Sequence, residues 1–119
     1  DAERAAWRDF DAHTAAGGLV TAHMDFLACC LFSDKHAPVL STLVPSVEPR
    51  PRGYTAAQVM VDGLLLRAVD PGVVGRWAHV PDLLALAERA LKYREITGEA
   101  TRTNIGSSVG RVRELLMSA

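Results

Sequence analysis

A run of helix-breaking residues near the middle of the chain limits what the rest of it can form. Within nine positions the chain carries Pro45, Pro49, Pro51 and Gly53. Because proline fixes one backbone angle and lacks an N–H group, this density favours an extended segment without helix or ladder pairing. We therefore predict a linker over residues 45–53, between an N-terminal helical layer (1–44) and a helical bundle (54–119). The alternative is one continuous domain.

Two helices are expected in the N-terminal half. The first covers residues 2–13, where apolar side chains at helical spacing share one face. The second covers residues 19–32 and is apolar on more than one face, which is typical of a helix buried in a bundle or covered by a partner. Pro38 suits the first position of one further short turn of helix.

The C-terminal half is predicted to be a series of short helices. Thr55 and Gln58 have the spacing of a capping box at the start of a helix over residues 55–69. Asp70 and Pro71 suit the cap and first position of the next helix. Further helices are expected over residues 83–93, over 98–103, and from Ser107 or Ser108 to Leu116. No window alternates strictly between apolar and polar residues, so the predicted fold class is all-α, a compact bundle of five to seven short helices.

The composition is that of an aliphatic domain with little net charge. The 119 residues are 49% hydrophobic and 6% aromatic, and 13 basic side chains oppose 14 acidic ones. This balance disfavours a disordered tail and a nucleic-acid binder that acts through bulk charge. No apolar run reaches the roughly 18 residues of a membrane span, so no membrane partner is expected. Adjacent Cys29 and Cys30 offer no disulfide framework and suit a reducing, intracellular compartment.

No set of residues converges on a catalytic or metal-binding mechanism. His23 and Cys30 are seven residues apart on one face of the expected helix, too far for one metal ion, and the short paired spacings of a zinc site are absent. Asp25 and Asp62 each interrupt an apolar helix but are more simply explained as solvated acids. Nucleophile-elbow and phosphate-loop sequences are also missing. We therefore expect no cofactor, no metal site and no enzymatic activity.

The C-terminal third carries the most specific pattern in the chain. A leucine-rich helix leads into an I-T-x-E turn that begins at Ile96, and then into a T-x-I-G-x-x-V-x-x-V-R segment that begins at Thr103. This stretch resembles the N-terminal domain of transcription elongation factor TFIIS, a helical bundle that elongin A and a Mediator subunit share. The resemblance covers residues 83–116, and its core positions are Ile96, Thr97, Ile105, Gly106, Val109 and Val112.

Most of these matched positions have an expected structural role. Thr97 is expected to cap a short helix, and Ile105 to fill the core between two helices. Gly106 is expected to permit a tight turn that a side chain would strain. Val109 and Val112 are one helical turn apart and are expected to face inward.

The resemblance implies a non-catalytic interaction module of a transcription-elongation or chromatin assembly in the nucleus. Such modules bind short, disordered, acidic and hydrophobic motifs of partner proteins in a groove between helices. Arg102, Arg111 and Arg113 are then the expected basic rim of that groove.

Two other classes of function stay open. The segment from Gly106 to Leu116 is also similar to the turn and recognition helix of a helix-turn-helix DNA-binding regulator, but Arg102 stands where such motifs pack a small residue. Nucleic acid is therefore an alternative partner that we do not favour. The other class is a helical oligomerisation or scaffold domain, in which the apolar helix over residues 19–32 contacts a second copy of the chain.

Overall fold

The structure is a computed structural model, and it describes most of the chain. The described residues are 2–8, 18–24, 30–33, 35–40, 44–46, 48–98 and 105–119. They form the helices α1 (Ala2–Ala6), α3 (Tyr54–Leu65), α4 (Val73–Arg76), α5 (Leu83–Gly98) and α6 (Ile105–Met117). They also form four short strands, β1 (Leu19–Val20), β2 (Cys30–Ser33), β3 (His36–Leu40) and β4 (Arg50–Pro51).

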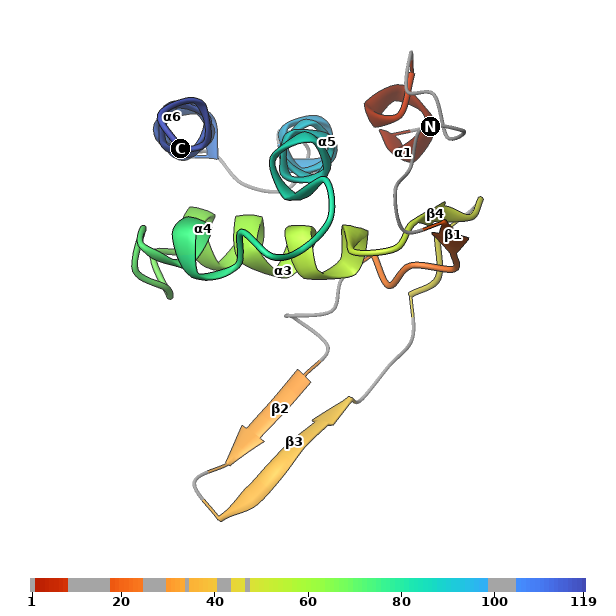
Figure 1. Cartoon of the computed structure of the whole chain (residues 1–119), viewed down its shortest axis with the longest axis vertical. Helices are drawn as coiled ribbons and strands as arrows, with labels where there is room; N and C mark the ends of the chain where they lie inside the picture. The colour runs from red at the N-terminus through yellow and green to blue at the C-terminus, as the bar shows by residue number, and fades with distance from the viewer. Residues whose placement is uncertain are drawn as a thin grey trace.

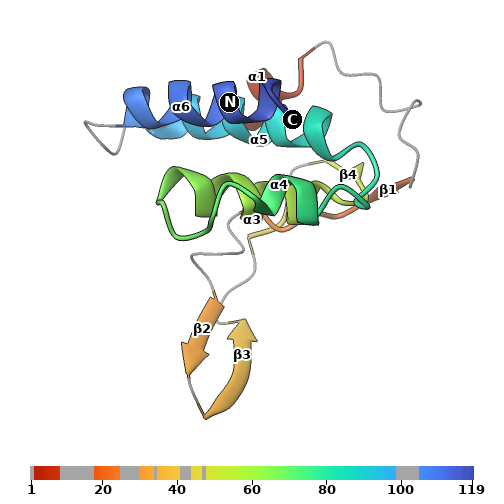
Figure 2. The ribbon, with the colours of Figure 1, turned by 60° about the vertical axis from the view of Figure 1, so that its left-hand side comes forward.

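The helices are arranged in two layers, with β1 and β4 at one end of them and the β2–β3 hairpin beyond α3 (Figure 1). Helices α1, α5 and α6 lie next to one another in one layer, and α3 with α4 forms the other. Helix α5 is central, because it contacts α1, α3 and α6. A second view shows the β2–β3 hairpin extending from the α3 side, away from α5 and α6 (Figure 2).

The core lies between the two helical layers. Helix α5 buries apolar side chains at three- and four-residue spacing, namely Leu83, Leu86, Ala87, Ala90 and Leu91. Helix α3 contributes Ala57, Met60, Val61 and Leu64 from its facing side. The N-terminal half shares this core through Ala6, Trp7, Ala22 and Met24. The described parts of both halves therefore pack against each other.

The predicted helix over residues 19–32 is wrong. Residues 19–20 and 30–33 are strands, and residues 25–29 lie outside the described part of the chain. Strand β3 contains Pro38, where the sequence predicts a turn of helix. Apolar stretches of this length fit a buried helix or a strand equally well, because periodicity alone does not separate the two. The fold of the described residues is mostly helical but not purely α-helical.

The strands pair antiparallel in two separate two-stranded sheets, and we call the described residues of 18–24 and 44–51, which pair with each other, the ribbon. Leu19 pairs with Pro51 at its base, His23 bridges to Pro45, and β2 pairs with β3 further out. The backbone N–H of Met24 donates to the carbonyl of Val44 at 2.7 Å. The prediction that prolines keep residues 45–53 from ladder pairing is therefore wrong at Pro45 and Pro51. Proline is tolerated at the edge of a sheet, and both sheets here have only two strands.

A buried ion pair attaches helix α1 to the base of the ribbon. The guanidinium of Arg50 donates to Glu3 Oε1 at 2.6 and 3.0 Å, and both side chains are almost fully buried. The same guanidinium lies 4.7 Å from the centre of the Trp7 ring, and the Tyr54 ring meets Trp7 edge-on. Of the predicted helix over residues 2–13, only Ala2–Ala6 is helical among the described residues, and positions 9–17 lie outside them.

Helix α3 begins differently from the predicted capping box. Its N-cap is Gly53, and no side chain caps it. The hydroxyl of Thr55 instead accepts a hydrogen bond from the backbone N–H of His23 at 3.1 Å, which joins the helix to the ribbon. Gln58 is fully buried, and its side-chain amide has no hydrogen-bond partner in the described structure. The hydroxyl of Tyr54 is also buried without such a partner there, and burial raises the pKa of Tyr54 above its ordinary value.

Asp62 is not the solvated acid that the sequence predicts. It is 8% exposed, and its two carboxylate oxygens accept hydrogen bonds from Arg94 of α5 at 2.8 and 2.9 Å. The Arg94 guanidinium also donates to the carbonyl of Met24 at 3.1 Å. One side chain therefore joins α3, α5 and the ribbon.

Replacement of Gly53 should destabilise the fold. Gly53 has φ +100°, in the left-handed region, and an added Cβ would lie 3.0 Å from Val80 Cγ1. We expect Gly53→Ala to lower the free energy of unfolding by about 1–2 kcal/mol, measured by urea denaturation. The matched control is Gly110→Ala in α6, where the added Cβ meets no neighbour and should raise stability by about 0.5–1 kcal/mol. Equal stability of the two variants would contradict this account.

Replacement of Gln58 should stabilise the fold, because its buried amide has no partner in the described structure. Gln58→Met keeps the length of the side chain and removes two unpaired polar groups. We expect the free energy of unfolding to rise by roughly 1 kcal/mol. The control is Glu88→Met, at an exposed position of α5, where the change should stay within about 0.5 kcal/mol. A loss of stability in Gln58→Met would mean that the amide is bonded in solution.

Candidate functional site

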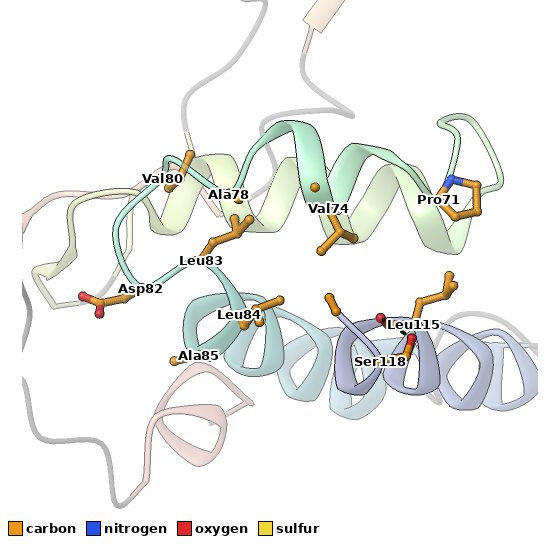
Figure 3. A pocket seen from close by; sticks show the side chains of 12 residues that line it. Pro71, Val74, Ala78, Val80, Asp82, Leu83, Leu84, Ala85, Leu115 and Ser118 are labelled. Atoms are coloured by element: carbon orange, nitrogen blue, oxygen red, sulfur yellow. Dashed lines mark hydrogen bonds between the residues drawn. The ribbon is translucent and has the colours of Figure 1, made fainter.

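An apolar groove opens between α4, the beginning of α5 and the end of α6 (Figure 3). Its volume is about 630 Å³. In Figure 3, Val74 points from α4 towards the α5–α6 layer, and Leu115 points back from α6. The lining is mainly aliphatic and comprises Pro71, Val74, Gly75, Ala78, Val80, Leu83, Leu84, Ala85, Leu115 and Ala119, with Asp82 and Ser118 as polar members.

The turn before α4 places one wall of the groove. The carboxylate of Asp70 accepts a hydrogen bond from the backbone N–H of Gly72 at 2.6 Å, and the Asp70 carbonyl accepts one from Val73 at 2.9 Å. Pro71 stands between them and has no N–H to satisfy. The sequence predicts Asp70 as the cap of this helix, and the N-cap position itself is occupied by Gly72. The turn brings Val74 to the floor of the groove, where it is buried.

The beginning of α5 supplies the opposite wall. Asp82 adopts φ +58°, a left-handed conformation, and its carbonyl accepts the N–H of Leu86 in the first turn of α5. The side chains of the next two residues point to the core and to the rim of the groove, because neighbours on a helix point in different directions. Leu83 is buried, whereas Leu84 is 41% exposed. The groove therefore has an apolar floor and an apolar rim that solvent reaches.

The chemistry of this lining suits binding of apolar side chains. Its two polar side chains are a single carboxylate and the Ser118 hydroxyl, which donates to the Leu115 carbonyl at 3.2 Å. General acid–base catalysis needs a proton donor or acceptor held near a reacting group, usually with a second group that orients it. The lining supplies no such pair of groups. In the described part of the chain, no three His, Cys, Asp or Glu residues cluster as a metal site would require.

The structure does not bring the predicted basic rim to this groove. Arg111 Nη2 donates to the carbonyl of Leu64 in the last turn of α3, which joins α6 to α3. Arg113 Nη2 donates to Glu95 Oε2 of α5 at 2.9 Å, in a pair that is partly exposed. Neither arginine is among the lining residues, and Arg102 lies outside the described part of the chain.

The residues of the resemblance take several different places. Val109 and Val112 are in the core, with 2% and 0% exposure. Thr97 is inside α5 and donates to the Tyr93 carbonyl at 3.0 Å, so its predicted role as the cap of a following helix is wrong. The predicted helix over residues 98–103 falls outside the described residues except for Gly98, which ends α5.

Of the other three matched positions, one lies on the surface of α5 and two lie in the first turn of α6. Ile96 is 42% exposed on α5. Ile105 and Gly106 are the first two residues of α6, so Gly106 is helical where the sequence predicts a turn. The placement of the Ile105 side chain is outside what the structure describes, and its predicted core role stays a prediction.

Sequence reasoning missed the groove, although it found its parts. The turn at Asp70 and the start of α5 are both predicted from local signals. No local signal predicts that the end of α6 lies beside this turn and the start of α5. Leu84 is one of the apolar residues that predict the helix over residues 83–93, and the structure leaves it exposed at the rim of the groove.

No protein-family model matches this chain, and neither a curated protein nor a solved structure matches it. None of the described helices is both long enough and apolar enough to cross a membrane. The function is therefore inferred from the groove and from the contacts around it.

The two described arginines of the predicted rim should differ in their effect on stability. Arg111→Ala removes a charged donor from a helix carbonyl, and we expect a loss of about 1–3 kcal/mol in the free energy of unfolding. Arg113→Ala breaks an ion pair whose side chains are 37% and 45% exposed, and the change should stay within about 0.5 kcal/mol. Thermal or urea denaturation measures both. Similar losses in the two variants would contradict the assigned contacts.

Proposed function

We propose that this chain is a non-catalytic protein-interaction module that binds a short disordered segment of a partner protein. The binding site is the groove between α4, α5 and α6. The observation that supports the proposal most directly is the apolar lining of this groove, with Leu84 exposed at its rim. The resemblance to the TFIIS N-terminal domain supports a transcription or chromatin protein as the partner, and a nuclear location.

The size of the groove suits one or two apolar anchor residues of the partner. Ligand sites usually have volumes of about 300–1,000 Å³, and this groove is within that range. Full burial of one Leu, Ile, Phe or Met side chain contributes about 1.5–3 kcal/mol. A disordered segment loses conformational entropy when it binds, so two anchors should give a modest affinity. A segment that already contains a turn of helix would lose less.

Acidic residues of the partner outside the groove are part of the proposal through Arg113, which does not line the groove itself. Its ion pair with Glu95 is partly exposed, and such pairs contribute about 0–1 kcal/mol to stability. A carboxylate of the partner can therefore replace Glu95 at little cost. Arg111 is a poorer candidate, because its guanidinium is held by the end of α3.

The test uses a phage-displayed library of random linear peptides and the full chain as the target. We expect enriched peptides to share one or two apolar anchors, and their affinity to fall at least tenfold for Leu84→Lys, measured by fluorescence anisotropy. The reason is that a lysine at the rim brings a charge to the apolar site.

The matched control is Ile96→Lys, on the same helix and at nearly the same exposure, 42% against 41%. Its peptide affinity should stay within about twofold of the original, because Ile96 does not line the groove. The proposal fails if no peptide is enriched. It also fails if Leu84→Lys and Ile96→Lys bind the enriched peptides equally well.

The DNA-binding alternative receives less support from the contacts of α6. A recognition helix must present one face to the major groove. Helix α6 buries Val109, Val112 and Leu116, and both arginines that would contact phosphate are engaged with α3 and α5. The oligomerisation alternative is favoured by a different feature, the β2–β3 hairpin.

A further inference from the structure

The β2–β3 hairpin extends from the body of the molecule, away from the helical layers (Figures 1 and 2). Residues 37–40 of β3 are all exposed. Successive side chains of a strand point to opposite faces, so both faces of β3 are uncovered. An isolated two-stranded ribbon is only marginally stable in water. Among the described side chains, those of residues 37–40 in β3 therefore lack the cover that the base of the ribbon obtains from the core.

The two edges of the hairpin differ in their capacity to pair. Strand β3 contains Pro38, which has no N–H to donate, and proline in a sheet normally turns its nitrogen to the outer edge. Strand β2 has the sequence Cys-Leu-Phe-Ser, with no proline, no glycine and no charged residue. Natural edge strands usually carry such features to prevent pairing with another chain. In the part of the chain that the structure describes, β2 pairs with β3 alone, so its other edge is open to pairing.

We propose that β2 pairs edge to edge with β2 of a second copy of this chain. Two identical strands that pair antiparallel are related by a two-fold axis, so both copies contribute the same backbone N–H and C=O groups to the contact. The product is a four-stranded antiparallel sheet in the order β3, β2, β2 of the second copy, β3 of the second copy. The proposal is independent of the groove.

Charge favours a second copy over an acidic or basic partner. Neither strand carries an acidic, lysine or arginine residue, and the formal net charge of the whole chain is −1. Identical edges therefore meet without repulsion, and a charged partner would find no complementary group on them. A sheet needs about three or more strands to be stable on its own, and the paired hairpins together have four.

The area of the contact sets the expected strength. Stable specific interfaces bury about 1,200–2,000 Å² in total, and edge pairing of two four-residue strands buries less than this. The dimer should therefore be weak and reversible, with a dissociation constant in the micromolar range or above.

Sedimentation of the full chain under reducing conditions, from about 1 µM to about 1 mM, measures the association. We expect a reversible monomer–dimer equilibrium. If the two strands align in full, position 31 of one copy lies opposite position 32 of the other. The double variant Leu31→Lys/Phe32→Lys then places like charges opposite each other, and its association should weaken at least tenfold.

A charge-exchange experiment tests the pairing itself. Leu31→Glu/Phe32→Glu should also be monomeric, and a mixture of the lysine and glutamate variants should form a heterodimer. Two controls keep the assignment specific. Val39→Lys changes the outer strand at a side chain that is 56% exposed, and Leu84→Lys changes the groove, so both should associate as the original chain does.

Several results would overturn the proposal. The chain could remain monomeric at the highest concentration, or the lysine double variant could associate normally. Loss of association in Val39→Lys would assign the contact to a sheet face, and loss in Leu84→Lys would assign it to the groove. Lysine and glutamate variants that are folded by circular dichroism but form no heterodimer when mixed would exclude pairing through β2.

Discussion

The junction between α3, α5 and the ribbon base depends on the hydrogen bonds of one side chain, Arg94. It donates to both oxygens of Asp62 in α3 and to the carbonyl of Met24 in the ribbon, and it belongs to α5. Both partners of the ion pair are largely shielded from water. Removal of either charge would leave the other partly buried and unpaired, which is costly in a protein interior. Arg94 therefore sets how the two helical layers and the ribbon base meet.

Both candidate interaction surfaces are consequences of this arrangement. Helix α5 carries Leu83 and Leu84 to the groove and contacts α3 and α6. The ribbon base is held by the Glu3–Arg50 pair and by the bond from His23 to Thr55. The outer hairpin receives no such contacts on the exposed residues of β3. The same chain thus presents a preformed groove on a packed body and an open strand edge outside it.

Local sequence signals predict much of the helical half and little of the rest. The periodicity of α5 and α6 is clear because each has one face against the core, and their buried residues follow it, whereas α3 is buried on several faces. The ribbon was not predictable in this way, because its pairing joins residues such as Leu19 and Pro51 that lie far apart along the chain. Asp62 and Arg111 show the same limit at single positions. Their chemistry is visible in the sequence, but the partners that give them a structural role are supplied by distant elements.

The contacts of Arg94, Arg50 and Thr55 should make the ribbon base and the helices one cooperative unit. Native-state hydrogen exchange of the backbone amides tests it directly, because Met24 and Ser46 each donate a ribbon hydrogen bond. We predict that these two amides exchange with the same opening free energy as core amides of α3 and α5, such as those of Val61 and Leu91. Ribbon amides that exchange through an opening of near-zero free energy, while the helix amides remain protected, would contradict the account.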